Sequence, residues 1–343
     1  MVKRPTIPDL AEAAGVSVST VNRVINKGDS VRQPTRERVL RAARDIGFYG
    51  LGTIEHSVTA GREIHRPGVL LLQERRPFYR DLGAAFRRAA AEHLDGRIDL
   101  TLEYLDDLSP DVVASRLKYL GSNCDSVALV AAEHPLISDA IDAVLSQGTP
   151  VLGLITPLTA RGNVGFVGLD SFKVGRTAAW AFDKICHQQG EIGILVGNTR
   201  YRNQDLNESG FRSYFREFGS GFTLLEPRAT FESANVAREM TEDLFAKHPD
   251  MCGLFISGGG ITGVLSALRE ARRPPGFVSV GYELMDATRI ALFDGTLTMA
   301  ISHPIEDLAR QTLAALIKSK RSGPDAGAQN VTLDFDIYTS ENI

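Results

Sequence analysis

Apolar positions near the start of the chain recur at the spacing of one helix face in three short segments. Gly15 stands between the first two segments, where its freedom of backbone conformation allows a sharp turn. This pattern predicts three short helices that bury one shared core. The inward positions are Leu10, Ala11 and Ala14, then Val21, Val24 and Ile25, and then Val39, Ala42, Ala43 and Ile46.

From Pro67 onward, short apolar runs alternate with longer amphipathic stretches such as 81–94 and 172–187. Runs of this length, rich in Val, Ile and Leu, are typical of strands buried on both faces. Their alternation with helices predicts an α/β fold with parallel sheets covered on both sides. The predicted strands are GVLLLQ, IDLTLEYL, SVALVAA, TPVLGLI, VGFVGL, EIGILVG, MCGLFIS, FVSVGY and LTMAIS.

Composition indicates a globular protein of more than one domain, because 343 residues of which 43% are hydrophobic can bury a large core. The basic start is followed by no apolar segment, and no run of about 18 apolar residues occurs, so we expect a cytoplasmic protein without membrane contact. Cys124, Cys186 and Cys252 lack the spacing of metal ligands and are expected to be buried thiols.

Charge divides the chain into a basic head and an acidic body. Residues 1–50 hold nine Lys or Arg against five acidic residues, whereas the rest of the chain holds 29 against 37. A basic head on an acidic body is typical of a polyanion-binding module attached to a domain with another task.

The head also carries the local signals of a helix-turn-helix. Thr6 and Asp9 have the spacing of a capping box at the start of the first helix, and Ser17 is a suitable cap for the second. With Gly15 at the turn between them, the two helices have the arrangement that places a helix in the DNA major groove.

The head resembles the DNA-binding domain of the LacI/GalR family of bacterial transcription regulators. The family pattern T-x-x-D-L-A-x-x-A-G-V-S-x-x-T-V-x-R-V-x-N is matched from Thr6 to Asn26, and Val31, TRERV and the pair Gly47 and Phe48 continue it. The resemblance implies a DNA-binding domain over residues 1–49. It implies DNA contacts by Thr6, Ser17, Val18, Ser19, Thr20, Asn22, Arg23 and Asn26.

The chemistry of these side chains assigns them different expected roles. Val18 and Ser19, at the start of the recognition helix, are expected to reach base edges, and Arg23 one turn later has the donors for guanine. Thr20, Asn22 and Asn26 are better placed for phosphates, which position the protein without reading sequence.

Residues 50–66 form the expected hinge, where family members push a leucine into the minor groove. Here Ser57 stands at the position expected for that leucine, and Gly50 and Gly52 replace the usual start of the hinge. Ile54 and Val58 are the candidate substitutes for the wedge.

By the same resemblance, residues 67–343 form an effector-binding domain of the type I periplasmic-binding-protein fold, with two lobes around a cleft. The chain is then expected to cross between lobes near Val164, Leu297 and Gly323. The lobes would comprise about 67–164 with 297–323, and 165–296 with 324–343.

The family's ligand pocket, carried over to this sequence, implies effector contacts by Phe78, Tyr79, Asp170, Asn207, Phe231 and Glu283. Asn207 replaces an arginine that grips the ligand in many family members, which argues against an anionic ligand, although Arg200 or Arg202 could supply the charge. Aromatic faces and carboxylates suit a neutral sugar or polyol. Asp170 could instead cap a helix, and Phe231 could belong to the core.

Two other functions share parts of this pattern. Gly258, Gly260 and Gly263 spell G-x-G-x-x-G after a strand, and Glu283 lies twenty residues beyond, as in an NAD-dependent oxidoreductase, but only eighty residues follow Gly263 to complete such a domain. A sugar-binding transport protein would share the body fold but would have no use for the head. No catalytic set or metal site has an interpretable spacing, and no cofactor is expected.

The sequence therefore predicts a regulator, and more specifically a homodimeric repressor that binds double-stranded, pseudo-palindromic operator DNA. A small polar effector, a sugar or polyol, would set its DNA affinity by favouring one closure of the lobes.

Overall fold

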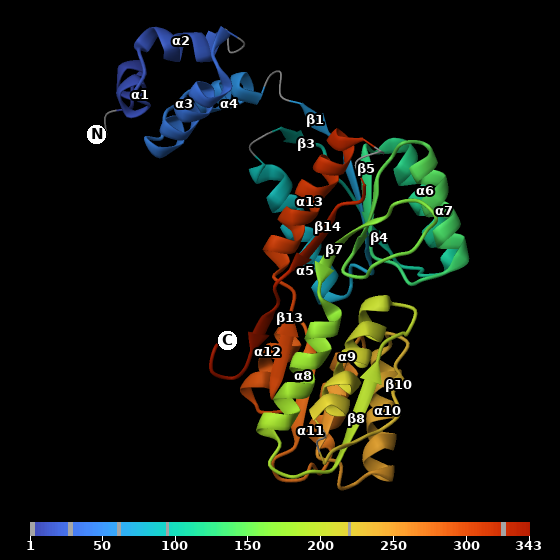
Figure 1. Cartoon of the computed structure of the whole chain (residues 1–343). Helices are drawn as coiled ribbons and strands as arrows, with labels where there is room; N and C mark the ends of the chain where they lie inside the picture. Colours follow the sequence, from blue (N-terminus) through green and yellow to red (C-terminus); the bar gives the residue numbers. More distant parts are fainter. Residues whose placement is uncertain (1–3, 27–29, 60–62, 94–95, 219–220, 324–326) are drawn as a thin grey trace. The chain divides into compact units, whose positions relative to one another are not determined.

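A computed structural model describes residues 4–26, 30–59, 63–93, 96–218, 221–323 and 327–343. Within these ranges the chain forms two compact units (Figure 1). One comprises positions up to His65 together with Ala91–Asp99, and the other comprises Arg66–Ala90 and Leu100–Ile343. We call them the headpiece and the body.

The headpiece contains the three predicted helices and a fourth that follows them. Its core is built from apolar residues of all four helices, so the head forms its own hydrophobic interior. The helices are α1 (Ile7–Ala13), α2 (Val18–Asn26), α3 (Gln33–Asp45) and α4 (Leu51–Thr59), and β1 (Ile64–His65) pairs with β3 (Arg97–Ile98) in parallel.

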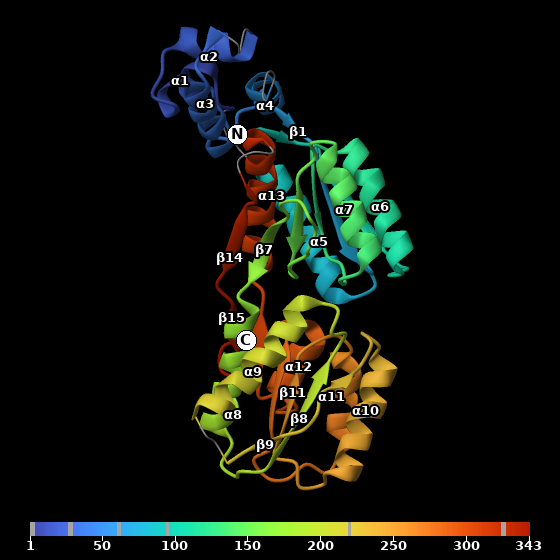
Figure 2. The ribbon, with the colours of Figure 1, turned by 45° about the vertical axis from the view of Figure 1, so that its right-hand side comes forward.

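The first lobe of the body is a six-stranded parallel sheet with the order β14-β7-β6-β5-β2-β4. Helices α6 and α7 cover one face, and α5 and α13 cover the other (Figures 1 and 2). The strands are β2 (Pro67–Leu72), β4 (Thr101–Leu105), β5 (Ser126–Leu129), β6 (Val151–Leu154), β7 (Gly165–Leu169) and β14 (Asn330–Leu333). The helices are α5 (Pro77–Glu92), α6 (Pro110–Asn123), α7 (Pro135–Ser146) and α13 (Ile305–Ser322).

The second lobe has the strand order β10-β8-β11-β12-β13-β15, with β9 paired to β8, and its last strand is antiparallel. Helices α8 and α9 lie on one face, and α10, α11 and α12 pack on the other (Figure 2). The strands are β8 (Glu191–Val196), β9 (Thr223–Leu224), β10 (Arg228–Ala229), β11 (Gly253–Ile256), β12 (Val278–Tyr282), β13 (Met299–Ser302) and β15 (Asp336–Tyr338). The helices are α8 (Ser171–Ile185), α9 (Arg202–Phe218), α10 (Ala234–Lys247), α11 (Ile261–Glu270) and α12 (Asp286–Phe293).

The crossings between the lobes lie later than the sequence predicted. Strand β7 pairs with β6 in the first sheet, so the first crossing follows Leu169 rather than Val164. Strand β13 pairs with β12 in the second sheet, so the second crossing follows Ser302 rather than Leu297. Strand β14 pairs with β7, which moves the third crossing from Gly323 to beyond Leu333. In each case the strand pairs with the sheet of the lobe that the chain is about to leave, so the crossing comes after the strand.

The three cysteines are free thiols. Cys124 and Cys252 are buried as predicted, whereas Cys186 is only half-buried. Burial raises the pKa of the Cys252 thiol to about 12, and the neighbouring Cys186 contributes to the rise, so Cys252 stays protonated near neutral pH.

Among the helices within the described ranges, none has the length and apolar character needed to cross a membrane.

Candidate functional sites: a recognition helix and an interlobe cavity

Side chains fix the ends of the first two helices in the headpiece. The Asp9 carboxylate accepts hydrogen bonds from the backbone N–H and the hydroxyl of Thr6, each at 2.7 Å. The Ser17 hydroxyl accepts from the backbone N–H of Thr20 at 3.2 Å. Gly15 adopts a φ of 61° at the turn, in the left-handed region that favours glycine. The turn residues thus set the direction in which α2 leaves the turn.

One face of α2 belongs to the core and the other faces solvent. Val21 and Val24 are fully buried, whereas Val18, at the start of the helix, is 42% exposed. Arg23 is exposed, and its Nε lies 3.5 Å from the Ser19 carbonyl oxygen. Of the eight predicted DNA contacts only Thr20 is half-buried; the exposed ones are Thr6, Ser17, Val18, Ser19, Asn22, Arg23 and Asn26.

Helix α4, which lies in the predicted hinge, packs against the other helices of the headpiece. Ile54 is fully buried in the headpiece core, and the Ser57 hydroxyl donates to the Val24 carbonyl of α2. Arg44 and Glu55 add an ion pair of 3.0 Å between α3 and α4. In this arrangement Ile54 is unavailable as a wedge, because its side chain fills the core. The side chain of Val58 lies outside the described residues.

The body contains a cavity of about 700 Å³ between the two sheets, which we call the interlobe cavity. Its lining comes from both lobes and from the segments that follow the carboxyl ends of the strands, including Gln73 after β2, Ile155 after β6, Ser257 after β11 and Glu283 after β12. This is the place where open α/β sheets bind ligands.

Aromatic side chains from both lobes line the cavity. Phe78 and Tyr79 begin α5, and each is 8% exposed, with their ring centroids 5.1 Å apart. Phe231 of the second lobe is 71% exposed and has a φ of 51°, a strained value for a bulky residue. A large exposed ring held in a strained conformation beside a cavity is available to cover the apolar face of a ligand.

Glu283 is held from three sides at the end of β12. Its Oε1 lies 2.7 Å from Nδ1 of His303, and its Oε2 accepts from the Ser302 hydroxyl and the His303 backbone N–H, each at 3.1 Å. Glu283 has a φ of 64°, and its side chain is 13% exposed. The carboxylate is therefore fixed in position, with His303 beside it in the cavity wall.

An ion pair joins the two lobes at the cavity. Nη2 of Arg76, just before α5, lies 2.6 Å from Oε2 of Glu232 in the second lobe. Gln204 Nε2 donates to Glu232 Oε1 at 2.7 Å, and Gln204 Oε1 in turn accepts from the backbone N–H groups of Gly197 and Asn198. Burial lowers the pKa of Arg76, but Tyr79 and Glu232 raise it by more, so the guanidinium stays charged.

Several polar atoms of the lining lack a protein partner. Within the described part of the chain, no hydrogen bond reaches Arg76 Nη1, Asn203 Oδ1, Ser257 Oγ or His303 Nε2. Buried polar groups normally have partners, so these four are suited to a polar ligand. Asn207 Oδ1 and the Tyr282 hydroxyl, in the same lining, also make no hydrogen bond within the described residues, and burial together with Glu283 raises the pKa of Tyr282 well above its usual range.

The structure brings together five of the six predicted effector contacts, which are Phe78, Tyr79, Asn207, Phe231 and Glu283. The sixth, Asp170, is absent from the lining: its carboxylate accepts from the backbone N–H of Lys173 at 3.1 Å and caps α8. Its expected effector contact is corrected to this capping role, because the first crossing between lobes places it at the start of α8.

The sequence missed Arg76, Glu232 and His303 as parts of this site. Each stands beside a predicted position or a strand end, but only the folded chain brings Arg76 to Glu232. Arg200 and Arg202, which could have supplied a cation, do not line the cavity.

The glycine-rich turn after β11 also borders the cavity, but neighbouring protein accounts for its glycines. A Cβ at Gly258 would lie 2.3 Å from the Gly197 nitrogen, and one at Gly263 would lie 1.7 Å from the Ala234 carbonyl oxygen. Gly260 has a φ of 89° at the start of α11. The glycines are thus required by close packing within the lobe, without a dinucleotide.

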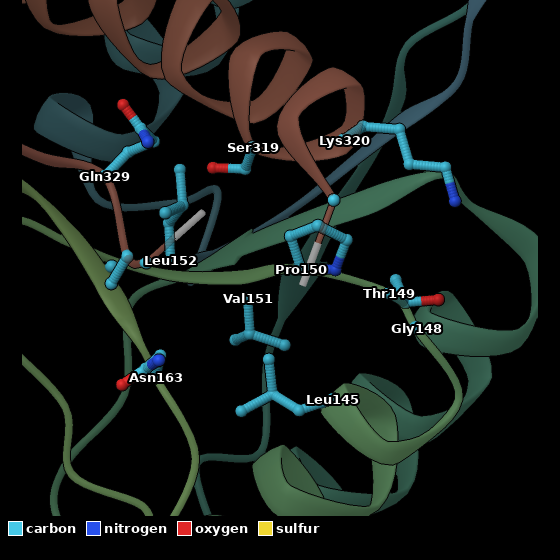
Figure 3. A pocket seen from close by; sticks show the side chains of 14 residues that line it. Leu145, Gly148, Thr149, Pro150, Val151, Leu152, Asn163, Ser319, Lys320 and Gln329 are labelled. Atoms are coloured by element: carbon cyan, nitrogen blue, oxygen red, sulfur yellow. The ribbon is translucent and has the colours of Figure 1, made fainter. Parts of the chain in front are cut away.

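A second, smaller cavity of about 240 Å³ lies within the first lobe (Figure 3). It is lined by Pro150 and Val151 at the start of β6 and by Ser319 and Lys320 near the end of α13. It therefore opens at the amino end of β6, away from the strand ends that line the interlobe cavity.

Comparison with known proteins agrees with the division into a headpiece and a body. Residues 6–50 match the family of bacterial regulatory proteins called the lacI family, and residues 77–321 match the periplasmic binding protein domain. The HTH-type transcriptional regulator CelR of Thermobifida fusca is 48% identical, covering 99% of this chain and 98% of that protein. The ribose operon repressor of Bacillus subtilis is 26% identical, covering 91% of this chain and 90% of that protein.

Solved structures share the fold of the body. A periplasmic solute binding protein of an ABC transporter from Actinobacillus succinogenes 130z, with bound D-allose, has a TM-score of 0.72 at 15% identity and covers 81% of this chain and 98% of its own. The head is what distinguishes this chain from such transport proteins. The chain belongs to the lacI family of bacterial regulatory proteins, DNA-binding transcriptional regulators with a periplasmic-binding-protein-like domain behind the helix-turn-helix.

Proposed function

We propose that this chain is a cytoplasmic, homodimeric repressor whose affinity for a pseudo-palindromic operator is set by a neutral sugar or polyol in the interlobe cavity. The observation that carries the effector assignment is the group of polar atoms in the cavity lining to which no described residue makes a hydrogen bond. Ligand hydroxyls both donate and accept, so they suit donors such as Arg76 Nη1 and acceptors such as Asn203 Oδ1 together.

Reading of DNA is assigned to the exposed face of α2. Val18 is 42% exposed and suits contact with a thymine methyl group, while Ser19 and Arg23 supply hydrogen bonds to base edges. Thr20, Asn22 and Asn26 are assigned to phosphates. In a homodimer, two copies of α2 related by a two-fold axis would read two half-sites.

In this proposal the hinge does not insert Ile54 into the minor groove. Ile54 would have to leave the headpiece core before it could enter the minor groove, and Ser57 already bonds to α2. We therefore expect α4 to remain with the headpiece when DNA binds and the operator to bend less than one bound by a leucine wedge.

In this proposal, closure of the lobes couples the effector cavity to the DNA-binding helix. The cavity is lined from both sheets, so a ligand there contacts both lobes in a closed arrangement and fewer groups in an open one. Such a ligand shifts the population toward closure, and operator affinity follows if DNA prefers one arrangement.

The effector is assigned as neutral because the half-buried cation of the cavity lining, Arg76, already has a counter-charge. Arg76 is paired with Glu232, and Asn207 stands where an arginine would supply a further positive charge. Names of related proteins agree with a carbohydrate effector: one relative is a ribose operon repressor, and proteins of the same fold hold D-allose and D-fucose.

Calorimetric titration of the full chain tests this assignment. A panel of pentoses, hexoses, disaccharides and polyols should contain a ligand that also changes affinity for the operator selected from random DNA. Glu283→Ala and Phe231→Ala should each weaken its binding at least tenfold, since a charge-assisted hydrogen bond or an aromatic contact is lost. Tight binding of a sugar phosphate or an organic acid, with neutral compounds inert and both variants unaffected, would refute it.

A further inference from the structure

The ion pair at the cavity has the geometry of a ligand contact. Arg76 lies over the Tyr79 ring, with its guanidinium carbon 5.1 Å from the ring centroid, and its Nη2 points to the Glu232 carboxylate at 2.6 Å. A guanidinium fixed in this way in a concave site is a group that proteins use to bind carboxylates and phosphates. Here its partner belongs to the protein itself.

Glu232 is held as a bound anion would be held. Its Oε1 accepts from the Gln204 amide at 2.7 Å and lies 3.4 Å from the Gly259 nitrogen, and its side chain is only 12% exposed. Its backbone adopts a φ of 60°, in the left-handed region. Three donors of different kinds, from Arg76, Gln204 and Gly259, thus converge on this one carboxylate in the lining of the cavity.

We propose that Glu232 determines the specificity of the interlobe cavity, because its carboxylate occupies the cavity's own anion-binding site and thereby excludes anionic ligands. This inference rests on the proposed function and explains its preference for neutral compounds. An anionic ligand would face the carboxylates of Glu232 and Glu283, with the Arg76 charge already neutralised. A neutral hydroxyl can still use Arg76 Nη1, which no described residue reaches.

The variant Glu232→Gln tests the proposal, because it removes the negative charge with little change of shape and leaves Arg76 without its counter-charge. Small anions serve as probes that do not depend on the identity of the effector. Acetate and inorganic phosphate should bind the variant roughly tenfold to a hundredfold more tightly than the unaltered chain, the range expected for one gained charge-assisted contact. Binding is measured by calorimetry at constant ionic strength.

Matched sugars extend the test to the effector. Pairs of neutral and anionic compounds, such as galactose with galacturonate and ribose with ribose 5-phosphate, are titrated into both proteins. The ratio of anionic to neutral affinity should rise at least tenfold in Glu232→Gln. The double variant Arg76→Gln/Glu232→Gln is the matched control and should lose this gain, since the cation that Glu232→Gln leaves without its counter-charge is removed as well.

The outcomes separate this inference from the proposed function. Neutral binding by the unaltered chain, with no gain of anion binding in Glu232→Gln, overturns the specificity role of Glu232 alone. Failure of every neutral compound to bind overturns the proposed effector, while acetate and phosphate still decide the role of Glu232. If Glu232→Gln does not fold, Arg76→Gln is titrated instead: it should reject anions as the unaltered chain does, and a gain of anion binding would overturn the proposal.

Discussion

In the headpiece, the residues that pack in the core differ from those expected to contact DNA. In the interlobe cavity, the same side chain can both stabilise the fold and line the ligand site. Along α2, Val21 and Val24 are buried in the core while Val18 and Arg23 lie on the exposed face. In the cavity, Glu283 lines the space and also binds two groups of His303. A helix packed on a small core keeps an exposed face that the core does not need, whereas the side chains that line a cavity also make contacts within the protein.

This difference affects what substitutions should do. In the headpiece, stability and DNA recognition should be separable, because a change on either face of a helix leaves the other face intact. In the cavity, a change at Glu232 or Glu283 removes a side chain of the lining and an internal hydrogen bond together. The following predictions test where this distinction holds, beginning with the largest effect.

Ile54→Ala should have the largest effect, on stability alone. Ile54 is fully buried in the headpiece core, so its truncation should destabilise the headpiece by about 2–5 kcal/mol. Hydrogen exchange of headpiece peptides, measured by mass spectrometry, should reveal this loss, while effector binding by the body should stay unchanged.

The control for Ile54→Ala is Ile290→Ala on α12, where the isoleucine is 59% exposed and truncation should change stability by about 0.5 kcal/mol or less. Unaltered protection of the headpiece in Ile54→Ala, together with loss of operator bending, would show that Ile54 acts on DNA rather than in the core.

The same distinction explains what the sequence could predict. The helix-turn-helix was predictable because its caps, turn and apolar stripe lie within about twenty neighbouring residues, and all nine predicted strands occur in the structure. The crossings were misplaced because an apolar run such as VGFVGL has the same pattern whichever sheet it joins. Short strands such as β10 were missed because two residues carry no periodicity.

The cavity was predictable only where the family pocket could be carried over. Arg76 and Glu232 lie 156 positions apart, so no local pattern relates them. His303 stood alone in the sequence, and its role emerges only when β12 and β13 pair and bring it to Glu283. Asp170 was placed in the pocket by resemblance, but its position after β7 makes it a helix cap.

Arg23→Ala should have an intermediate effect, on DNA recognition alone. Loss of its proposed contact with a base should weaken specific operator binding by about 1–3 kcal/mol and relax the preference at one base pair in each half-site. Stability should change little, because Arg23 is exposed and its closest hydrogen-bond contact is the Ser19 carbonyl at 3.5 Å.

Asn26→Ala is the matched change on the same helix, with a proposed phosphate contact, and should weaken binding to all DNA sequences alike. Binding-site selection with each variant gives the measurement. A motif identical to that of the unaltered protein after Arg23→Ala would refute the assigned base contact.

Phe231→Gly should have the smallest of the three main effects, and there stability and binding should move in opposite directions. Phe231 is 71% exposed, so loss of its ring removes little buried surface. Its φ of 51°, however, costs a residue with a side chain about 1 kcal/mol that glycine avoids.

Phe231→Ala removes the same ring and keeps the strain, so it is the matched control. Chemical denaturation should find the glycine variant about 1 kcal/mol more stable than the alanine variant, while calorimetry should find effector binding weakened equally in both. Equal stability of the two variants would mean that the backbone at Phe231 relaxes without cost, and unweakened binding would remove the ring from the site. The expected result would mark Phe231 as a position of this cavity where, as on α2, a side chain serves the ligand without supporting the fold.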